Sequence, residues 1–274
     1  FLSRIKVSIF LSILVDKTKF SGHPPFSFIA TAHSIKWNGL KPVFVDVERQ
    51  YGNLCLDKVE SAINRNTGGI LATHNYGFPG SNKELDSISK RYGVPLLYDC
   101  APGFGVKIEG DSITNFGDIS VLSFHATKVF TTFEGGAIIS STLELKKKVD
   151  LLLNFGIVNE ETVSSLGTNG KINESQAAMG LLQLRYFDEN IKKRKVIYNY
   201  YLNKLKINKN IKLIEIPKEI EYNFSYFPLF FEEGFEKREQ IFKKLLKNNI
   251  FCRKYWYPLI SDHSVYKNDK KHDL

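Results

Sequence analysis

Between residues 40 and 140, short apolar runs alternate with longer amphipathic stretches, and few folds accommodate such an order. In residues 56–63, for example, Leu56, Val59 and Ile63 repeat at the three- and four-residue spacing of a helix. The apolar runs predict strands at 42–47, 68–76, 94–100, 118–125 and 135–141, with helices at 56–63 and 83–93. This strand–helix order predicts an α/β domain with a mainly parallel sheet flanked by helices.

After residue 142 the pattern becomes largely helical. It predicts helices at 143–155 and 174–205, a strand at 224–231, a helix at 235–249 and a strand at 250–260. We therefore expect two domains: a large α/β domain over residues 1–190 and a smaller C-terminal α+β domain over residues 191–274.

Charge and cysteine content narrow the class of protein further. Residues 190–274 contain 19 Lys and Arg against 10 Asp and Glu, so this last third carries the whole net charge of +9. We interpret the excess as solvated lysine-rich helices, because no nucleic-acid-binding motif accompanies it. Attraction of an anionic substrate is the alternative. The three cysteines are widely spaced and form no disulfide or metal-binding pattern, which predicts a cytoplasmic protein.

The first residues are apolar but do not predict a membrane protein. The run at 5–15 is too short to span a bilayer, and no small-residue cleavage site follows it. A secretion signal is therefore the minor alternative for this run. Because the chain begins at Phe1 rather than Met, we expect it to be a fragment.

The densest group of chemically active side chains lies in residues 123–134. Ser123 and His125 lie at the end of the predicted strand at 118–125, and Lys128 follows it closely. A lysine here suits a Schiff-base nucleophile if burial or a neighbouring cation lowers its pKa, because attack on a carbonyl requires the neutral amine. Most lysines at strand ends are simply solvated, so Lys128 alone does not define a site. One histidine beside a lysine does not indicate a metal site, and we predict none.

Asp99 is the second residue of the candidate site. It ends an apolar run, where an unpaired carboxylate is costly to bury. A carboxylate suits pyridoxal phosphate, whose ring nitrogen stays protonated when it pairs with an anion. A helix N-cap or a surface ion pair is the alternative. Since Asp99 and Lys128 both follow strands of a parallel sheet, we expect them at the same edge, where they predict a cofactor site.

Four segments of the chain resemble one known family. Residues 26–47 read FSFIATAHSIKWNGLKPVFVDV, and residues 98–125 read YDCAPGFGVKIEGDSITNFGDISVLSFH. Residues 123–138 read SFHATKVFTTFEGGAI, and residues 167–194 read GTNGKINESQAAMGLLQLRYFDENIKKR. In order and spacing these segments resemble the sugar aminotransferases of fold type I, the DegT/DnrJ/StrS group, from residue 24 to residue 266. They are most similar to enzymes that aminate dTDP-linked 6-deoxy keto sugars at C3 or C4.

The resemblance implies a fold type I transferase that binds pyridoxal 5'-phosphate. It would pass an amino group from a donor such as L-glutamate to the nucleotide-linked keto sugar, for deoxyamino-sugar and surface polysaccharide (lipopolysaccharide, O-antigen) biosynthesis. Lys128 would hold the cofactor as a Schiff base and move the proton, and Asp99 would pair with the ring nitrogen. Ser123 would bind the phosphate. Phe28 would stack on the cofactor ring, with ordinary core packing as the alternative.

The resemblance also implies a homodimer. In this family, the segment that contains Asn169 and Lys171 reaches across to the neighbouring subunit's cofactor phosphate. Either of the two residues would make that contact. A basic residue such as Arg253 would meet the diphosphate of the nucleotide sugar. No nucleic acid or membrane partner is expected.

The chain departs from the family pattern in several places. Residues 1–23 lack the Gly-Thr or Ser-Ala phosphate loop, and the chain stops short of the usual closing strand and helix, so we expect an altered N-terminus and a truncated C-terminus. Pro102 stands where the family has His or Gln, and proline offers no donor to the cofactor. A catalytically impaired or non-catalytic homologue is therefore the alternative. A sugar dehydratase on the same scaffold would carry histidine in place of Lys128.

Overall fold

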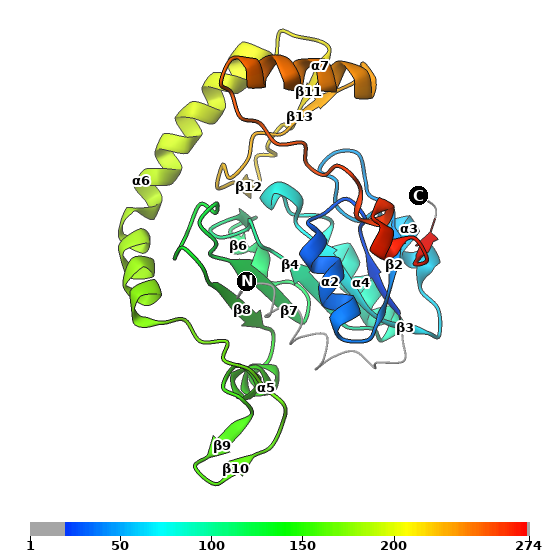
Figure 1. Ribbon diagram of the computed structural model, residues 1–274, viewed down its shortest axis with the longest axis vertical. Coiled ribbons are helices and arrows are strands. Elements are labelled where there is room, and N and C mark those ends of the chain that lie inside the picture. The colour runs from blue at the N-terminus through cyan, green and yellow to red at the C-terminus, as the bar shows by residue number, and fades with distance from the viewer. Residues whose placement is uncertain (1–19, 273–274) are drawn as a thin grey trace.

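The computed structural model describes residues 20–272 and confirms the predicted α/β class (Figure 1). Its main element is a seven-stranded sheet in the order β14-β2-β1-β3-β4-β7-β8. Every neighbouring pair is parallel except β7 and β8, which are antiparallel. The strands of this sheet are β1 (Phe20–His23), β2 (Lys41–Val45), β3 (Thr67–Thr73), β4 (Leu96–Asp99), β7 (Ile119–Ser123), β8 (Gly136–Ser140) and β14 (Lys270–His272).

Helices cover both faces of this sheet, because its central strands are apolar on both sides. In β3, Leu71 packs in a cluster with Ile35 and Val149, which come from two helices on one face. Its neighbours Ile70 and Ala72 point the other way, into a cluster that includes side chains of the helices on the opposite face. The first face carries α2 (Ile29–Trp37) and α5 (Leu143–Leu153), and the second carries α3 (Leu56–Ala62) and α4 (Asn82–Tyr92).

The predicted strands and helices between residues 40 and 140 are all present in the structure. Helix α4 ends at Gly93, as predicted from the sequence. Gly93 has a φ of 62°, the left-handed conformation that glycine adopts without a steric penalty at a helix C-terminus. The predicted strand at 68–76 is shorter than expected, since β3 ends at Thr73 and a 3-10 turn, η1 (Asn75–Gly77), follows.

The long helix α6 (Glu174–Leu205) has the predicted bounds and leads from the sheet to a small α+β unit (Figure 1). A capping box fixes its start: the Gln176 N–H donates to Asn173 Oδ1, and the Asn173 N–H donates to Gln176 Oε1. In the small unit, α7 (Gly234–Lys247) packs against the antiparallel pair β11 (Ile211–Leu213) and β13 (Leu229–Phe231).

Several short elements complete the described chain. A small sheet contains β5 (Lys107–Ile108), β6 (Asp111–Ser112) and β12 (Ile220–Glu221). The hairpin of β9 (Ile157–Asn159) and β10 (Thr162–Val163) projects beyond α5 (Figure 1). The remaining 3-10 turns are η2 (Ile113–Asn115), η3 (Ile260–Asp262) and η4 (Ser264–Tyr266).

The predicted strand at 250–260 is wrong. Within residues 20–272 this segment pairs with no strand and instead crosses from α7 to the main sheet. Its side chains face two different surfaces: Arg253, Tyr255 and Trp256 line a cavity, whereas Lys254 and Tyr257 contact α7. The predicted strand at 224–231 is confirmed only from Leu229, because Pro228 has no N–H to donate to a strand partner.

The end of the described chain returns to the main sheet. Strand β14 pairs with β2, and Tyr266 packs against Phe44 and Ala32. The division into domains at residue 190 stays a prediction. The apolar run at 5–15 lies outside the described residues. Among the helices that the structure describes, none is both long and apolar enough to cross a membrane.

Candidate functional site

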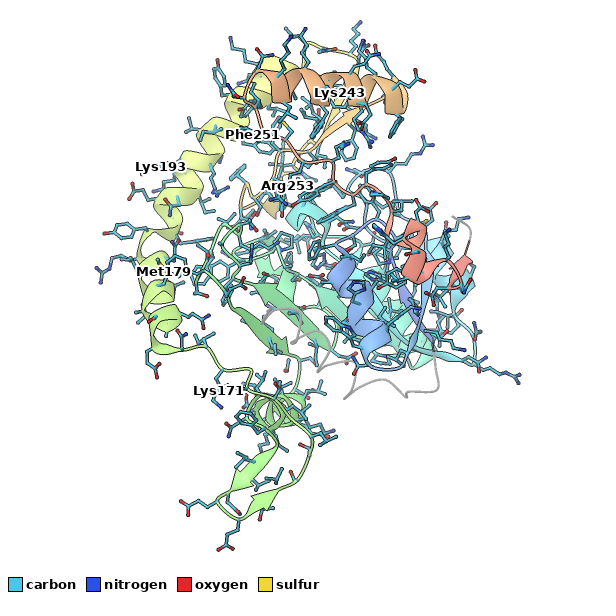
Figure 2. The ribbon with its side chains drawn as sticks, in the orientation of Figure 1. Lys171, Met179, Lys193, Lys243, Phe251 and Arg253 are labelled. Carbon is cyan, nitrogen blue, oxygen red and sulfur yellow. The ribbon has the colours of Figure 1, made fainter. Side chains whose placement is uncertain are left out.

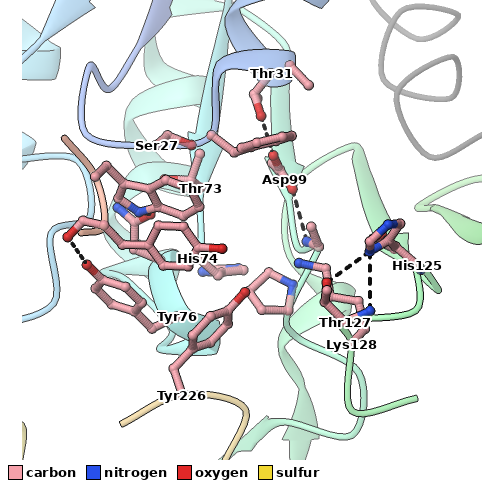
Figure 3. Close-up of a pocket in the computed structure, with 18 of the residues that line it drawn as sticks. Ser27, Thr31, Thr73, His74, Tyr76, Asp99, His125, Thr127, Lys128 and Tyr226 are labelled. Atoms are coloured by element: carbon pink, nitrogen blue, oxygen red, sulfur yellow. Dashed lines mark hydrogen bonds between the residues drawn. The ribbon is translucent and has the colours of Figure 1, made fainter. Parts of the chain in front are cut away.

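A cavity of about 300 Å³ lies at the carboxyl ends of β3, β4 and β7 (Figure 3). Ligands of α/β sheets bind at this edge. The start of α2 contributes to one wall, and Tyr226 and the segment 253–256 contribute another. The structure brings together four of the predicted site residues in this one cavity: Phe28, Asp99, Ser123 and Lys128. Their individual roles stay predictions.

Asp99 ends β4, in register with Thr73 of β3 and Val121 of β7. Thr31 Oγ1 donates a hydrogen bond of 2.5 Å to its Oδ2, and the Ala101 N–H donates one of 2.9 Å to its Oδ1 (Figure 3). Because both oxygens are held, the carboxylate has one orientation at the cavity. A fixed carboxylate is what a protonated ring nitrogen requires as a partner.

Lys128 follows β7 after a tight turn, in which its N–H donates to the His125 carbonyl over 2.9 Å. Burial lowers the pKa of the Lys128 amine, while Asp99 and Tyr255 act in the opposite direction. A lowered pKa increases the neutral fraction at a given pH, and the neutral amine is the form that attacks a carbonyl. Lys128 thus has the property expected of a Schiff-base nucleophile.

His125 braces the same turn with its side chain. Its Nδ1 accepts a hydrogen bond of 3.2 Å from the Thr127 N–H (Figure 3). Its Nε2 lies 3.6 Å from Glu134 Oε1. Ser123 is buried at the end of β7, where its Oγ accepts from the His125 N–H over 3.4 Å. Within residues 20–272, no three His, Cys, Asp or Glu side chains gather in a group that could hold a metal ion.

Phe28 immediately precedes α2 and is 42% exposed. The centre of its ring lies 6.0 Å from that of Trp256. Ordinary core packing would bury a phenylalanine ring. The exposed fraction at the cavity therefore favours a stacking role over the core-packing alternative.

Asn169 and Lys171 do not line this cavity. They lie on the segment between β10 and α6, where Lys171 stands well apart from Arg253 (Figure 2). Asn169 forms a β-bridge with Asn154, and Lys171 Nζ donates to Asn154 Oδ1 over 2.6 Å. One chain therefore does not bring all six predicted cofactor residues together, and the prediction for these two requires a second subunit.

The residues that line the cavity and that the sequence analysis missed include Thr31, Tyr76, Tyr226, Tyr255 and Trp256. The Tyr76 hydroxyl donates to the Tyr255 carbonyl over 3.1 Å, and Trp256 Nε1 donates to Asn75 Oδ1 over 3.1 Å. These bonds hold the segment 253–256 against the strand ends. Helix spacing could have indicated Thr31, because it lies one turn after Phe28. No sequence signal indicates that the other four meet.

Pro102 also lines the cavity and contributes no side-chain donor. Its carbonyl accepts from Asn223 Nδ2 over 2.7 Å and from Ser225 Oγ over 3.2 Å. The small unit thus holds the loop after Asp99 through the backbone. The departure from the family pattern leaves both hydrogen bonds to Asp99 in place.

The sequence model of the DegT/DnrJ/EryC1/StrS aminotransferase family matches residues 23–274. The chain belongs to this family. A dTDP-4-amino-4,6-dideoxy-D-glucose transaminase of Shigella dysenteriae is 43% identical over 245 residues, which cover 89% of this chain and 67% of the relative. A UDP-4-amino-4,6-dideoxy-N-acetyl-beta-L-altrosamine transaminase of Campylobacter jejuni is 32% identical, over 89% of this chain and 66% of the relative. The chain thus spans about two thirds of the length of these curated relatives.

Solved structures have the same fold. The crystal structure of DesI in the presence of its TDP-sugar product matches with a TM-score of 0.92 at 27% identity, over 99% of this chain and 70% of DesI. PseC of Helicobacter pylori matches with a TM-score of 0.90 at 24% identity, over 97% of this chain and 73% of PseC. These matches confirm the predicted fold class. The DegT/DnrJ/EryC1/StrS family uses pyridoxal phosphate, so membership of this family confirms the predicted cofactor.

Proposed function

We propose that this chain forms the active site of an aminotransferase that aminates a nucleotide-linked keto-6-deoxy sugar, with L-glutamate as the amino donor. One observation carries the proposal: a single cavity holds Lys128, Asp99 and Ser123 beside the exposed ring of Phe28. The Shigella dysenteriae and Escherichia coli relatives, 43% and 42% identical, are dTDP-4-amino-4,6-dideoxy-D-glucose transaminases. Their similarity favours a dTDP-linked sugar and amination at C4 rather than C3.

The cavity residues fit pyridoxal phosphate. Asp99, which Thr31 holds in place, would pair with the ring nitrogen. Phe28 would cover one face of the ring, and Ser123 would bind the phosphate. When bound, the cofactor supplies a ring that accepts electrons from the reacting carbon of the substrate.

Lys128 is the group that moves the proton in this proposal. Burial lowers the pKa of its amine, so the side chain releases a proton more readily than an exposed lysine does. Asp99 keeps its position during the reaction, because two donors hold its oxygens. The aromatic side chains of Tyr226, Tyr255 and Trp256 line the cavity and limit the access of water.

We infer that the working form is a homodimer. Asn169 and Lys171 reach no cofactor site in their own chain, so a neighbouring subunit's site is their proposed target. The same part of the chain exposes large apolar side chains, which a subunit interface would cover: Val163, Leu166, Leu181 and Leu184. Sedimentation velocity tests this, since a monomer with full activity contradicts it.

We also propose that the protein is cytoplasmic. Cys55, Cys100 and Cys252 are all free thiols, as expected in a reducing compartment. Fractionation of cells that express the protein would check it, and recovery from a secreted fraction would contradict it.

An absorbance titration with pyridoxal phosphate tests the proposed function. The wild-type chain should develop the visible band of lysine-bound cofactor, and L-glutamate should convert it to the spectrum of the aminated cofactor. Lys128→Ala should show neither the band nor its conversion. Lys171→Ala retains Lys128 and should therefore still form the band. The absence of a band in the wild type at saturating cofactor would favour the non-catalytic alternative.

A further inference from the structure

The Tyr226 side chain brings an unused donor into the cavity. Its hydroxyl points inward from the wall opposite Asp99 (Figure 3). The Tyr226 carbonyl accepts a hydrogen bond of 3.4 Å from the Tyr222 hydroxyl, but within residues 20–272 the Tyr226 hydroxyl itself has no partner. Burial raises the pKa of this hydroxyl, so it keeps its proton at neutral pH and can donate it to a ligand of the cavity.

Packing and hydrogen bonds fix the place of this phenol. The centre of the Tyr226 ring lies 5.7 Å from that of Tyr76 and 5.9 Å from that of Tyr255, and both contacts are edge-to-face. One residue earlier, the Ser225 hydroxyl donates to the Pro102 carbonyl over 3.2 Å. The phenol is therefore held beside the loop that follows β4, on the side of the cavity where Tyr76 follows β3.

Pyridoxal phosphate requires a donor on that side. Its ring carries an ionised oxygen next to the carbon that bonds to the lysine, and an anionic oxygen withdrawn from water needs a hydrogen bond. On the ring, this oxygen and the phosphate lie on opposite sides of the line from the nitrogen to the lysine-bound carbon. With Asp99 of β4 at the nitrogen and Ser123 of β7 at the phosphate, the oxygen would face the side of β3.

Several donors on the side of β3 are already used. The Tyr76 hydroxyl donates to the Tyr255 carbonyl, and Trp256 Nε1 donates to Asn75 Oδ1. The Asn75 amide nitrogen donates to two backbone carbonyls. These groups hold the wall together and have no further N–H or O–H to offer to a ligand.

Two buried side chains at the end of β3 also have polar atoms without a partner among the described residues, Thr73 Oγ1 and His74 Nε2. His74 stacks on Tyr98 with ring centres 4.6 Å apart, on the face of the sheet away from Asp99. Thr73 pairs in register with Asp99, so its short side chain lies level with the carboxylate. The ring oxygen lies beyond the ring nitrogen as seen from Asp99, which favours the longer Tyr226 side chain as its donor.

We propose that the Tyr226 hydroxyl binds the ring oxygen of pyridoxal phosphate and so replaces the side-chain donor that Pro102 cannot provide. This assignment rests on the proposed function. The donor then comes from the small unit instead of from the loop after β4, so tight cofactor binding depends on the contact between the two. The proton still moves through Lys128, and the phenol contributes to binding the ring.

The test compares Tyr226→Phe with Tyr200→Phe in the cofactor-loaded protein. Tyr200 is 62% exposed on α6, so the control loses the same hydroxyl away from the cavity. Absorbance against pH gives the midpoint at which the lysine-bound nitrogen loses its proton. Without that proton the ring oxygen depends on the protein for a donor, so Tyr226→Phe should raise the midpoint by about one pH unit. The affinity for pyridoxal phosphate should fall about tenfold, and Tyr200→Phe should behave as the wild type does.

Pro102→Gln and Pro102→His provide a second comparison, because each restores a side-chain donor to the loop after β4. Added to Tyr226→Phe, at least one of them should bring the midpoint back toward the wild-type value. An unchanged midpoint and affinity in Tyr226→Phe overturn the assignment, and so does a raised midpoint that neither replacement of Pro102 lowers. A shift confined to Thr73→Val overturns it as well and would assign the ring oxygen to β3.

The cofactor band separates this assignment from the proposed function. A wild-type chain that forms no band at saturating cofactor contradicts the function. A normal band whose midpoint is the same in the wild type and in Tyr226→Phe contradicts the assignment of Tyr226 alone.

Discussion

The two sides of the cavity are built in different ways. The sheet side presents Asp99, Ser123 and Lys128 at or just after the ends of neighbouring parallel strands, where backbone pairing fixes their positions. The mouth side presents Tyr226 and Arg253 from segments without helix or strand. Segments of this kind change in sequence without disturbing the sheet beneath them. We infer that the chemistry depends on the sheet side and the choice of substrate on the mouth side.

Among substitutions that distinguish the two sides of the cavity, Lys128→Ala should have the largest effect on turnover. The substitution removes the amine that moves the proton, so turnover of the nucleotide sugar should fall about 10²- to 10⁴-fold or more. Steady-state kinetics with a keto-sugar substrate measure it. Lys243→Ala, which removes an exposed lysine on α7, serves as the control and should keep normal turnover. Near-normal turnover in Lys128→Ala would mean that the chemistry does not depend on the sheet side.

Acidic pH should lower the free energy of unfolding because of two buried histidines of the sheet side. Burial lowers the pKa of His74, which follows β3, to about 3, and that of His23 in β1 to about 4, from an ordinary value of 6.5. Below pH 6.5 the unfolded chain binds protons that the folded chain does not, so the free energy of unfolding decreases as pH falls. From pH 6.5 to pH 5 each histidine should cost at most about 2 kcal/mol.

Urea unfolding at pH 7 and pH 5 measures this loss. The unfolding midpoint of the wild type should fall at pH 5, and His74→Asn should show a smaller dependence on pH than the wild type. Equal midpoints at the two pH values would mean that the histidines titrate normally in the folded chain.

Thr31→Val probes the support beneath the sheet side. The variant keeps the shape of the side chain and loses the hydroxyl that donates to Asp99 Oδ2. A hydrogen bond to a charged group contributes about 1.5–3 kcal/mol, so the affinity for pyridoxal phosphate should fall about tenfold or more. Titration of the visible band measures the affinity. Ser34→Ala is the matched control, because the Ser34 hydroxyl on the same helix donates to the Thr31 carbonyl and does not contact Asp99.

Trp256→Phe should have the smallest effect and act only on the mouth side. It keeps an aromatic ring near Phe28 and loses the donor to Asn75 Oδ1. A neutral hydrogen bond contributes about 1 kcal/mol, so KM for the nucleotide sugar should rise about fivefold with kcat and the cofactor band unchanged. A fall in kcat that exceeds the change in KM would mean that the mouth side contributes to the chemical step.

The sequence predicted the sheet side because its residues carry local signals. Asp99 and Lys128 each follow an apolar run that the strand–helix alternation identifies as a strand of one parallel sheet. The mouth side has no such signal. The run of apolar and aromatic residues around Tyr255 resembles a strand, yet its side chains contact a cavity on one side and α7 on the other. Tyr226 reaches the cavity only through the packing of units far apart in the chain.

The pairing of β14 with β2 has a consequence for the order of assembly. Strands β1, β2, β3, β4 and β7 leave the ribosome well before β14 and can pair in the order β2-β1-β3-β4-β7. The segment 253–256 also follows these strands in the chain. The nascent chain therefore contains the reacting groups before it contains the rim that selects the substrate. Until then the free edge of β2 is exposed, and it is the place where a chaperone would be needed against strand-to-strand aggregation.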